Sequence, residues 1–123
     1  MALDILIVDD SAAIRKILQR VLVQAEVPLG KVHEASDGVE ALEKLQEEPV
    51  GLILSDINMP NMDGLELLGR LKAHATWKTL PIVMVTTEGS QNKVMQALEL
   101  GAAGYVKKPF TAEQIRETLM GLI

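Results

Sequence analysis

The sequence predicts an α/β fold in which a five-stranded parallel sheet carries helices on both faces. Three apolar runs, at residues 5–8, 51–54 and 82–85, are continuous rather than alternating, as in strands that are buried on both faces of a parallel sheet. Segments with apolar residues at helical spacing separate these runs. Strict alternation of strand and helix favours parallel strands joined by helical crossovers, which place helices on both faces.

The strands and helices follow in a regular order. The first strand is expected at ILIV (5–8), a weaker second one at KVHEA (31–35), and the next two at GLIL (51–54) and IVMV (82–85). A short fifth strand is expected at GYV (104–106). Four segments place apolar residues on one helical face: Ile14, Ile17, Leu18, Val21 and Leu22; Leu65, Leu68 and Leu71; Val94, Ala97 and Leu98; Ile115, Leu119 and Leu122.

Helix ends are marked by capping residues and prolines. The pairs Asp37–Glu40, Asp63–Glu66 and Thr111–Gln114 have the spacing of a capping box. Pro49 and Pro81 stand where the preceding helices should have ended. There is no internal repeat, low-complexity stretch or linker, so residues 1–123 are expected to form one domain.

Composition excludes several classes of protein. With 48% hydrophobic and 24% charged residues the chain is typical of a globular protein, and its net charge of −5 argues against direct nucleic-acid binding. The absence of cysteine excludes disulfides and thiolate metal sites, and the isolated His33 and His74 argue against a histidine zinc site. Neither a signal peptide nor a membrane-length apolar run is present, so we expect a cytoplasmic protein without a membrane partner.

Polar residues stand at the carboxyl ends of four predicted strands. They are Asp9, Asp10 and Ser11 after the first strand, Ser55, Asp56 and Asn58 at the third, Thr86 and Thr87 at the fourth, and Lys107, Lys108 and Pro109 at the fifth. In an open parallel sheet, ligands bind outside the carboxyl ends of the strands. We therefore expect these side chains to meet at one edge of the sheet.

Three carboxylates at one edge need an explanation. Two unit charges ~5 Å apart at an effective dielectric constant of ~20 repel by roughly 3 kcal/mol, so a bound cation or a protonated carboxyl would be required. All-oxygen ligands suit a hard ion such as Mg²⁺. The alternative is that Asp9 and Asp10 lie in a solvated loop that caps the next helix. Asp56 at the third strand and Lys108 at the fifth favour the cation site.

Four sequence segments resemble the receiver domain of response regulators. VDDS, SDINMPNMDGLELL, VTTE and GYVKKPF occur in the order and spacing of that family and span essentially the whole chain. MPNMDGLELL and KPFTA are especially similar to the stand-alone chemotaxis receivers of the CheY type. The resemblance implies a flavodoxin-like fold with strand order 2-1-3-4-5, an order known for CheY and carried over here rather than derived.

The resemblance also implies roles for individual residues. Asp56 is expected to be the phosphoacceptor, with Lys108 pairing with the phosphoryl group and the Thr86 hydroxyl contacting it. One Mg²⁺ is expected to bind the carboxylates of Asp10 and Asp56 and the backbone carbonyl of Asn58, with Asp9 acting through water. Tyr105 is expected to turn inward after phosphorylation, and the bond between Lys108 and Pro109 is expected to be cis.

The implied function is that of a phosphoacceptor in a two-component system. A histidine kinase would be the phosphodonor, and the domain would catalyse its own Mg²⁺-dependent phosphorylation and dephosphorylation without being a conventional enzyme. The fourth helix, fifth strand and fifth helix would bind a protein target, expected to be the flagellar motor switch in chemotaxis, and a phosphatase is a further possible partner. We expect a monomer. Several output-face residues depart from the enteric chemotaxis pattern: Gly89, Gln91, Val94, Lys107 and Thr118.

Three other functions are compatible with parts of the sequence. A phosphorelay intermediate or the receiver of a DNA-binding regulator would share the chemistry but differ in its partner. A flavodoxin-like cofactor binder would need a Ser/Thr/Gly-rich phosphate loop where this chain has VDDSAA, and an aspartyl phosphatase would need a second acid in place of Asn58.

Some side chains also have purely structural interpretations. Tyr105 could be an edge packing residue with a hydrated hydroxyl, and Thr86 and Thr87 could simply end a strand. The remaining expectations are that Met59, Met62, Met84 and Met95 fill the core, that Trp77 packs in a loop, and that Arg15 and Lys16 lie on the solvated face of the first helix.

Overall fold

The computed structural model describes residues 2–87 and 91–122, so Gly89 lies outside the described residues. Within these ranges the chain alternates strictly between five strands and five helices. In order they are β1 (Leu3–Val8), α1 (Ala12–Gln24), β2 (Leu29–Ala35), α2 (Gly38–Glu47), β3 (Leu52–Asp56), α3 (Gly64–Lys72), β4 (Ile82–Thr86), α4 (Gln91–Leu100), β5 (Gly104–Lys107) and α5 (Ala112–Met120). All five predicted strands are present, including the weaker second one.

The strands form one parallel sheet in the order β2-β1-β3-β4-β5, which confirms the predicted fold class. β3 is the central strand, and all five of its residues are buried. Asp56 at its carboxyl end pairs in register with Val85, and Val8 pairs with Ser55. The end of β3 therefore lies between the end of β1 and the end of β4.

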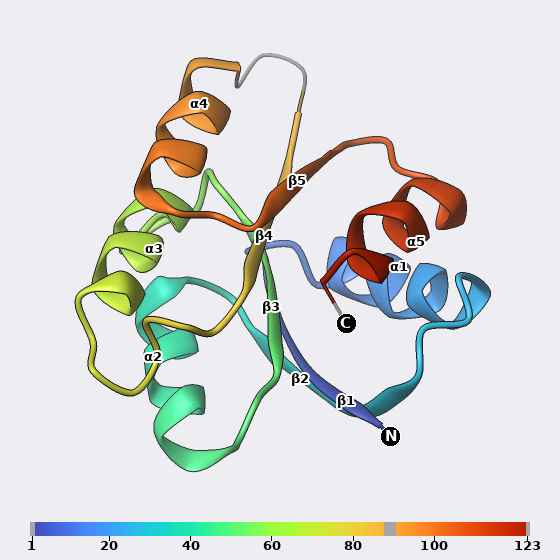
Figure 1. The fold of residues 1–123 in the computed structure, drawn as a ribbon, viewed down its shortest axis with the longest axis horizontal. Helices are drawn as coiled ribbons and strands as arrows, with labels where there is room; N and C mark the ends of the chain where they lie inside the picture. The colour runs from blue at the N-terminus through green and yellow to red at the C-terminus, as the bar shows by residue number, and fades with distance from the viewer. Residues whose placement is uncertain (1, 88–90, 123) are drawn as a thin grey trace.

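Helices cover both faces of the sheet, with α1 and α5 on one side and α2, α3 and α4 on the other (Figure 1). Alternate residues of β1 divide between the two layers: Ile5 and Ile7 pack toward α1 and α5, whereas Leu6 and Val8 pack on the opposite side. Both faces of the central strands are thus removed from water, which explains their continuous apolar sequences. None of the helices among the described residues is long and apolar enough to cross a bilayer.

Three predicted core residues are exposed instead. Ile17 is 43% exposed, Met95 60% and Leu98 42%. α1 packs through Leu18 and Leu22, so Ile17 falls on the flank of the apolar stripe. α4 lies over the edge of the sheet on β4 and α3, where only Val94 and Ala97 become buried. The predictions for these side chains were wrong because helical spacing shows which side of a helix is apolar, but not how much of that side the sheet and the neighbouring helices cover.

All three predicted helix caps are present, but only one is reciprocal. Asp37 and Asp63 each accept a hydrogen bond from the backbone N–H three residues later. Thr111 does the same, and the Gln114 side chain returns a bond by accepting from the Thr111 N–H at 3.1 Å. The glutamates of the other two pairs bind side chains instead: Ser36 donates to Glu40, and Arg70 to Glu66.

The sharp turn after β3 depends on close backbone packing. Gly64 opens α3 and donates its N–H to the Ile57 carbonyl at 2.8 Å. A Cβ at Gly64 would collide with the backbone oxygen of Asp56 and would lie 2.9 Å from the Cα of Ile57. The turn also contains Asn61 at a positive φ of 65°, a conformation that asparagine tolerates better than most residues. Glycine is therefore required at 64 to bring α3 back against the end of β3.

Trp77 packs in the loop that leads into β4, as predicted. Its indole stacks on the His74 ring, with 3.9 Å between centroids and 16° between planes. It also packs against the hydrophobic core between the sheet and α2, α3 and α4. Because this loop precedes β4, the stack lies at the amino-terminal edge of the sheet, opposite the end that carries Asp56.

Candidate functional site

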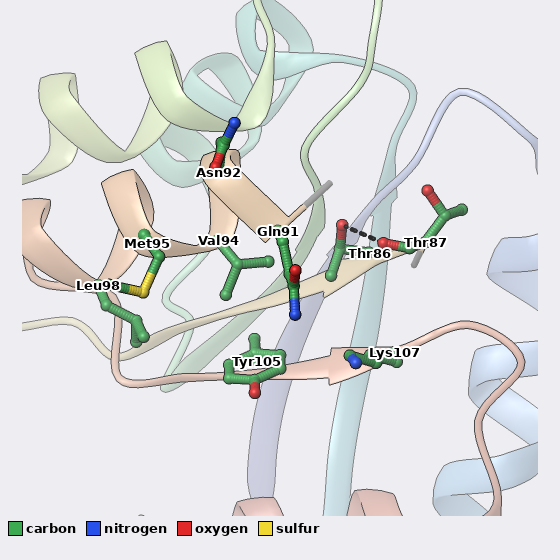
Figure 2. Close-up of a pocket in the computed structure, with 9 residues that line it drawn as sticks. All are labelled: Thr86, Thr87, Gln91, Asn92, Val94, Met95, Leu98, Tyr105 and Lys107. Atoms are coloured by element: carbon green, nitrogen blue, oxygen red, sulfur yellow. Dashed lines mark hydrogen bonds between the residues drawn. The ribbon is translucent and has the colours of Figure 1, made fainter. Parts of the chain in front are cut away.

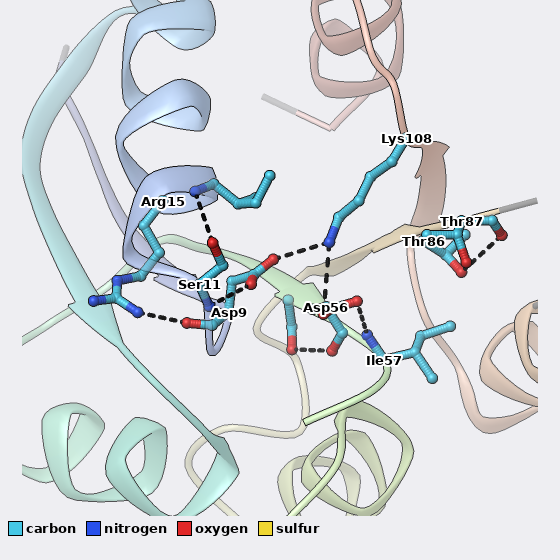
Figure 3. Close-up of polar contacts among 10 residues, drawn as sticks. Asp9, Ser11, Arg15, Asp56, Ile57, Thr86, Thr87 and Lys108 are labelled. Carbon is cyan, nitrogen blue, oxygen red and sulfur yellow. Dashed lines mark hydrogen bonds and ion pairs between the residues drawn. The ribbon is translucent and has the colours of Figure 1, made fainter. Parts of the chain in front are cut away.

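The structure brings the polar residues at the strand ends together (Figure 3). Asp9 follows β1, Asp56 ends β3, and Lys108 follows β5. One carboxylate oxygen from each of Asp9, Asp10 and Asp56 lies within 4.8 Å of the other two. Sequence order alone separates these residues widely, and it is the parallel arrangement of the strands that gathers them at one edge.

Lys108 extends between two of the carboxylates. Its Nζ lies 3.0 Å from Oδ2 of Asp9 and 3.5 Å from Oδ2 of Asp56. Its backbone N–H donates to the Thr86 carbonyl, which ties the segment after β5 to the end of β4. The peptide between Lys108 and Pro109 is cis, as the family resemblance implies.

Asp9 is buried, with every polar group engaged. Its N–H donates to the Ala35 carbonyl at 3.0 Å, and its Oδ1 accepts from the Ser11 N–H at 2.9 Å. Ser11, not an aspartate, caps α1, because its hydroxyl accepts from the Ile14 N–H. The alternative of a solvated aspartate pair that caps the helix is therefore wrong for Asp9, whereas Asp10 is exposed.

Asp56 is a buried carboxylate whose charge is only partly compensated. Only 8% of the residue is exposed, and Oδ1 accepts a hydrogen bond from the Ile57 N–H at 2.8 Å. Burial raises the pKa of Asp56 above its ordinary value, and the neighbouring Asp9 charge adds to this effect while Lys108 opposes it. A cation bound beside Asp56 would favour its ionised form and so oppose this effect.

The donor set fits Mg²⁺ well. The oxygens come from Asp9, Asp10 and Asp56, and hard carboxylate ligands are those that Mg²⁺ prefers. Asp10 is exposed, so the site opens to solvent on that side and can keep the waters that Mg²⁺ retains. Lys108 supplies a single positive charge against three carboxylates, which leaves the cluster with net negative charge.

Asn58 lies on the exposed rim of this cluster. Its side-chain Oδ1 accepts a hydrogen bond from Lys93 Nζ at 2.6 Å. The predicted metal ligand is a different atom of Asn58, its backbone carbonyl oxygen, which this hydrogen bond does not use. Lys93 comes from α4 and was not anticipated from the sequence. No local pattern could have indicated it, because the two residues are 35 positions apart.

Thr86 and Tyr105 line one pocket beside the cluster (Figure 2). Thr86 is buried, and its hydroxyl donates to the Thr87 carbonyl at 3.3 Å. Tyr105 stands on the neighbouring strand with 42% of its surface exposed. The pocket has a volume of about 340 Å³, and its other lining residues are Thr87, Gln91, Asn92, Val94, Met95, Leu98 and Lys107.

Arg15 is a site neighbour that the sequence reasoning missed. It was expected on the solvated face of α1, but its side chain is only 16% exposed. Its Nε donates to Glu34 at 2.9 Å, and Nη1 donates to the backbone carbonyl of Asp9 at 2.6 Å. Burial alone would raise the pKa of Glu34, but hydrogen bonds from Lys16 and Arg15 hold it below its ordinary value. Only the register of β1 with β2 brings Glu34 within reach.

Comparison with known proteins agrees with this geometry. The sequence model for the response regulator receiver domain matches residues 5–120. The chain belongs to the response regulator receiver family. The receiver is 42% identical over 118 residues to the chemotaxis protein CheY homolog of Campylobacter jejuni strain 81-176. The matched residues make up 94% of this chain and 88% of that protein.

Solved structures place the receiver in the same group. The chemotaxis response regulator CheY4 of Vibrio cholerae is 36% identical and superposes with a TM-score of 0.86. The match covers 100% of both chains. The phosphorylated cyanobacterial phytochrome response regulator RcpA is 28% identical with a TM-score of 0.80, over 99% of this chain and 91% of that one. The chain is thus a CheY-like receiver domain of two-component signalling.

Proposed function

We propose that this receiver takes a phosphoryl group from a histidine kinase onto Asp56, with one Mg²⁺ bound beside it. The observation that carries the proposal is the buried Asp56 carboxylate, which lies 3.5 Å from the Lys108 ammonium within a cluster of three carboxylates. We treat residues 1–123 as one receiver domain that works in the cytoplasm as a monomer.

The chemistry is transfer of a phosphoryl group between two nucleophiles. An oxygen of Asp56 attacks phosphorus, the P–N bond to the kinase histidine breaks, and the imidazole nitrogen retains the electron pair. An acyl phosphate on Asp56 results. Hydrolysis reverses the modification: water attacks phosphorus, the bond to the Asp56 oxygen breaks, and inorganic phosphate leaves. Such transfer depends on positioning and charge neutralisation more than on protein covalent chemistry.

The surrounding side chains supply those two requirements. Asp10, Asp56 and the Asn58 carbonyl would hold Mg²⁺, with Asp9 acting through water. When bound, the ion supplies positive charge between Asp56 and an anionic donor. Lys108 neutralises negative charge on the phosphoryl oxygens, and the Thr86 hydroxyl donates a hydrogen bond to one of them.

Signalling would follow from the movement of Thr86. When its hydroxyl leaves the Thr87 carbonyl for the phosphoryl group, the adjacent pocket gains room for the Tyr105 ring. The altered face of α4, β5 and α5 then binds a protein target. We propose the flagellar motor switch as this target, since similar proteins are named for chemotaxis. A phosphatase is proposed as a further partner, beside the receiver's own hydrolysis.

The alternative is a phosphorelay intermediate or the receiver of a DNA-binding regulator. It keeps the same chemistry and differs in the target. The composition of the face formed by α4, β5 and α5 favours this alternative, because several of its residues depart from the enteric chemotaxis pattern: Gln91, Val94, Lys107 and Thr118.

Labelling with a small phosphodonor tests the proposal. Phosphoramidate carries a P–N bond like that of phosphohistidine, and with Mg²⁺ it should add one phosphoryl group per chain, mapped to Asp56 by mass spectrometry. Asp56→Asn should not be labelled. Asp63→Asn is the matched control, because asparagine preserves the α3 cap and removes an acid from the same loop. Labelling of Asp56→Asn at the wild-type rate would refute the proposal.

A further inference from the structure

The Arg15 side chain reaches from α1 back to the loop after β1, where Asp9 lies (Figure 3). Its Nη1 donates to the Asp9 carbonyl at 2.6 Å, while its Nε donates to Glu34 on β2 at 2.9 Å. Lys16 donates to the other Glu34 oxygen at 3.0 Å. The guanidinium is therefore held at a fixed angle between β2 and the end of β1, with little exposure to solvent.

The carbonyl that Arg15 binds belongs to the peptide between Asp9 and Asp10. A peptide unit is planar, so fixing its oxygen also fixes the direction of the Asp10 N–H. On the other side of Asp10, the Ser11 N–H is held by Oδ1 of Asp9. Both peptides that flank Asp10 are thus restrained.

The Asp10 side chain has no such restraint of its own. Within residues 2–87 and 91–122 its carboxylate accepts no hydrogen bond and forms no ion pair, although it is one of the three acids of the cluster. The position of its carboxylate near Asp56 therefore depends on the conformation of the Asp10 backbone. Arg15 restrains the peptide before Asp10, and Oδ1 of Asp9 restrains the peptide after it.

We propose that Arg15 is a positioning residue for the Mg²⁺ site, where its guanidinium orients the Asp9–Asp10 peptide and so presents the Asp10 carboxylate to the metal. The inference rests on the proposed function. Residues that orient metal ligands commonly change metal affinity by roughly 10- to 100-fold when they are removed.

The sign of the effect separates positioning from simple electrostatics. Arg15 is a cation near a cation site, so by charge alone its removal should strengthen Mg²⁺ binding. Positioning predicts the opposite. Lys16 provides the matched control: it lies on the same helix, carries the same charge and binds the same Glu34, but it does not contact the Asp9 carbonyl. Arg15→Lys keeps the charge and loses the planar fork that spans both partners.

The experiment measures the Kd for Mg²⁺ from the amide NMR shifts of Asp10 and Ser11, at fixed ionic strength and below the melting transition of each variant. Arg15→Met should raise the Kd about tenfold. Arg15→Lys should give a smaller increase, and Lys16→Met should leave the Kd unchanged or lower it. At saturating Mg²⁺, phosphoramidate labelling of Arg15→Met should return toward the wild-type rate, since the acceptor itself is intact.

A Kd for Arg15→Met equal to or below that of the wild type would overturn the inference and leave the proposed function standing. If Arg15→Met does not fold, Arg15→Lys decides by the same criterion. A wild-type protein whose Asp10 and Ser11 amides do not respond to millimolar Mg²⁺ would overturn the inference and the proposed Mg²⁺ site together.

Discussion

Lys108 lies closer to Asp9 than to Asp56: its Nζ is 3.0 Å from the Asp9 carboxylate and 3.5 Å from that of the proposed phosphoacceptor. Asp9 is 1% exposed, so Lys108 is the cation that compensates a charge buried at the end of β1. A phosphoryl group on Asp56 would compete with Asp9 for this lysine. The lysine therefore compensates the buried Asp9 charge in this structure, and in the proposed function it would also pair with the phosphoryl group.

Lys108→Met should destabilise the fold by roughly 3 kcal/mol, because breaking a buried ion pair leaves an uncompensated charge. Urea unfolding followed by circular dichroism measures the loss. Lys107→Met is the control, since that neighbour is exposed, and it should change stability by less than about 0.5 kcal/mol. Adding Asp9→Asn to Lys108→Met should restore part of the stability. An equal, small effect of both single lysine variants would show that Asp9 does not depend on Lys108.

Asp10→Asn should raise the metal-free melting temperature by a few degrees, the shift expected for roughly 1 kcal/mol in a domain of this size. The reason is relief of repulsion within the cluster of Asp9, Asp10 and Asp56. Wild-type stability should rise with the logarithm of Mg²⁺ concentration, and this response should largely vanish in the variant. Paired thermal melts in chelator and across a Mg²⁺ series provide the test. A variant that is less stable in chelator, or that keeps the full Mg²⁺ response, contradicts the assignment of Asp10.

Asp56→Asn should stabilise the metal-free protein at neutral pH by on the order of 1 kcal/mol. The pKa of Asp56 is raised above 3.8 in the fold, mainly by burial, so ionisation is resisted more in the folded than in the unfolded state. Wild-type stability is thus lost relative to the variant as pH rises from about 3.8 through the raised pKa. Unfolding experiments between pH 3 and pH 7 should show the difference shrinking toward acid. If the stability difference between Asp56→Asn and the wild type grows toward acid pH, the pKa of Asp56 is lowered in the fold, which contradicts the prediction.

Binding of beryllofluoride, a phosphoryl mimic, should move Tyr105 from its exposed position into the pocket beside Thr86. Tyr105 is the only tyrosine in the sequence, so fluorotyrosine labelling gives a single ¹⁹F resonance that reports its environment. The resonance should shift on addition of beryllofluoride with Mg²⁺. Thr86→Ala lacks the hydroxyl that is drawn to the mimic and should reduce the shift strongly. A resonance that stays unchanged in the wild type while the loop after Asp56 responds would exclude this coupling.

Gly64→Ala should destabilise the protein by roughly 2 kcal/mol, the range for overpacking a rigid site. The added Cβ would collide with the backbone of Asp56 and Ile57, neither of which can turn aside. Gly69→Ala in the same helix is the matched control. Among residues 2–87 and 91–122, and apart from its chain neighbours and the backbone of its own helix, no atom lies within 4 Å of a Cβ at that position. The higher helix propensity of alanine should therefore stabilise α3 by up to about 1 kcal/mol. Equal effects of the two substitutions in chemical denaturation would exclude the proposed close contact.

Much of this architecture could be predicted because its causes are local or periodic. Continuous apolar runs predict buried parallel strands, and the residues immediately after those strands must share an edge. The meeting of Asp9, Asp10, Asp56 and Lys108 follows from that rule alone. Strand order, in contrast, came from the family resemblance, since no local signal specifies which strand lies beside which.

The errors have a different origin. Arg15 looks like a solvated residue in sequence, and only the pairing of β1 with β2 supplies its Glu34 partner. Lys93 reaches Asn58 across 35 positions for a similar reason. Met95 and Leu98 fit an apolar helical face, but the edge of the sheet is too narrow to cover them. Each error concerns how far one element reaches over another, which depends on tertiary packing.

The stack of Trp77 on His74 has a practical consequence in spectroscopy. Trp77 is the only tryptophan in the chain, and it lies at the end of the sheet opposite Asp56. Its fluorescence should therefore respond to loss of packing in the hydrophobic core, while the indole lies far from charge changes at the edge that carries Asp56. The protein thus contains an intrinsic reporter of folding whose emission can be compared directly before and after treatment with a phosphodonor.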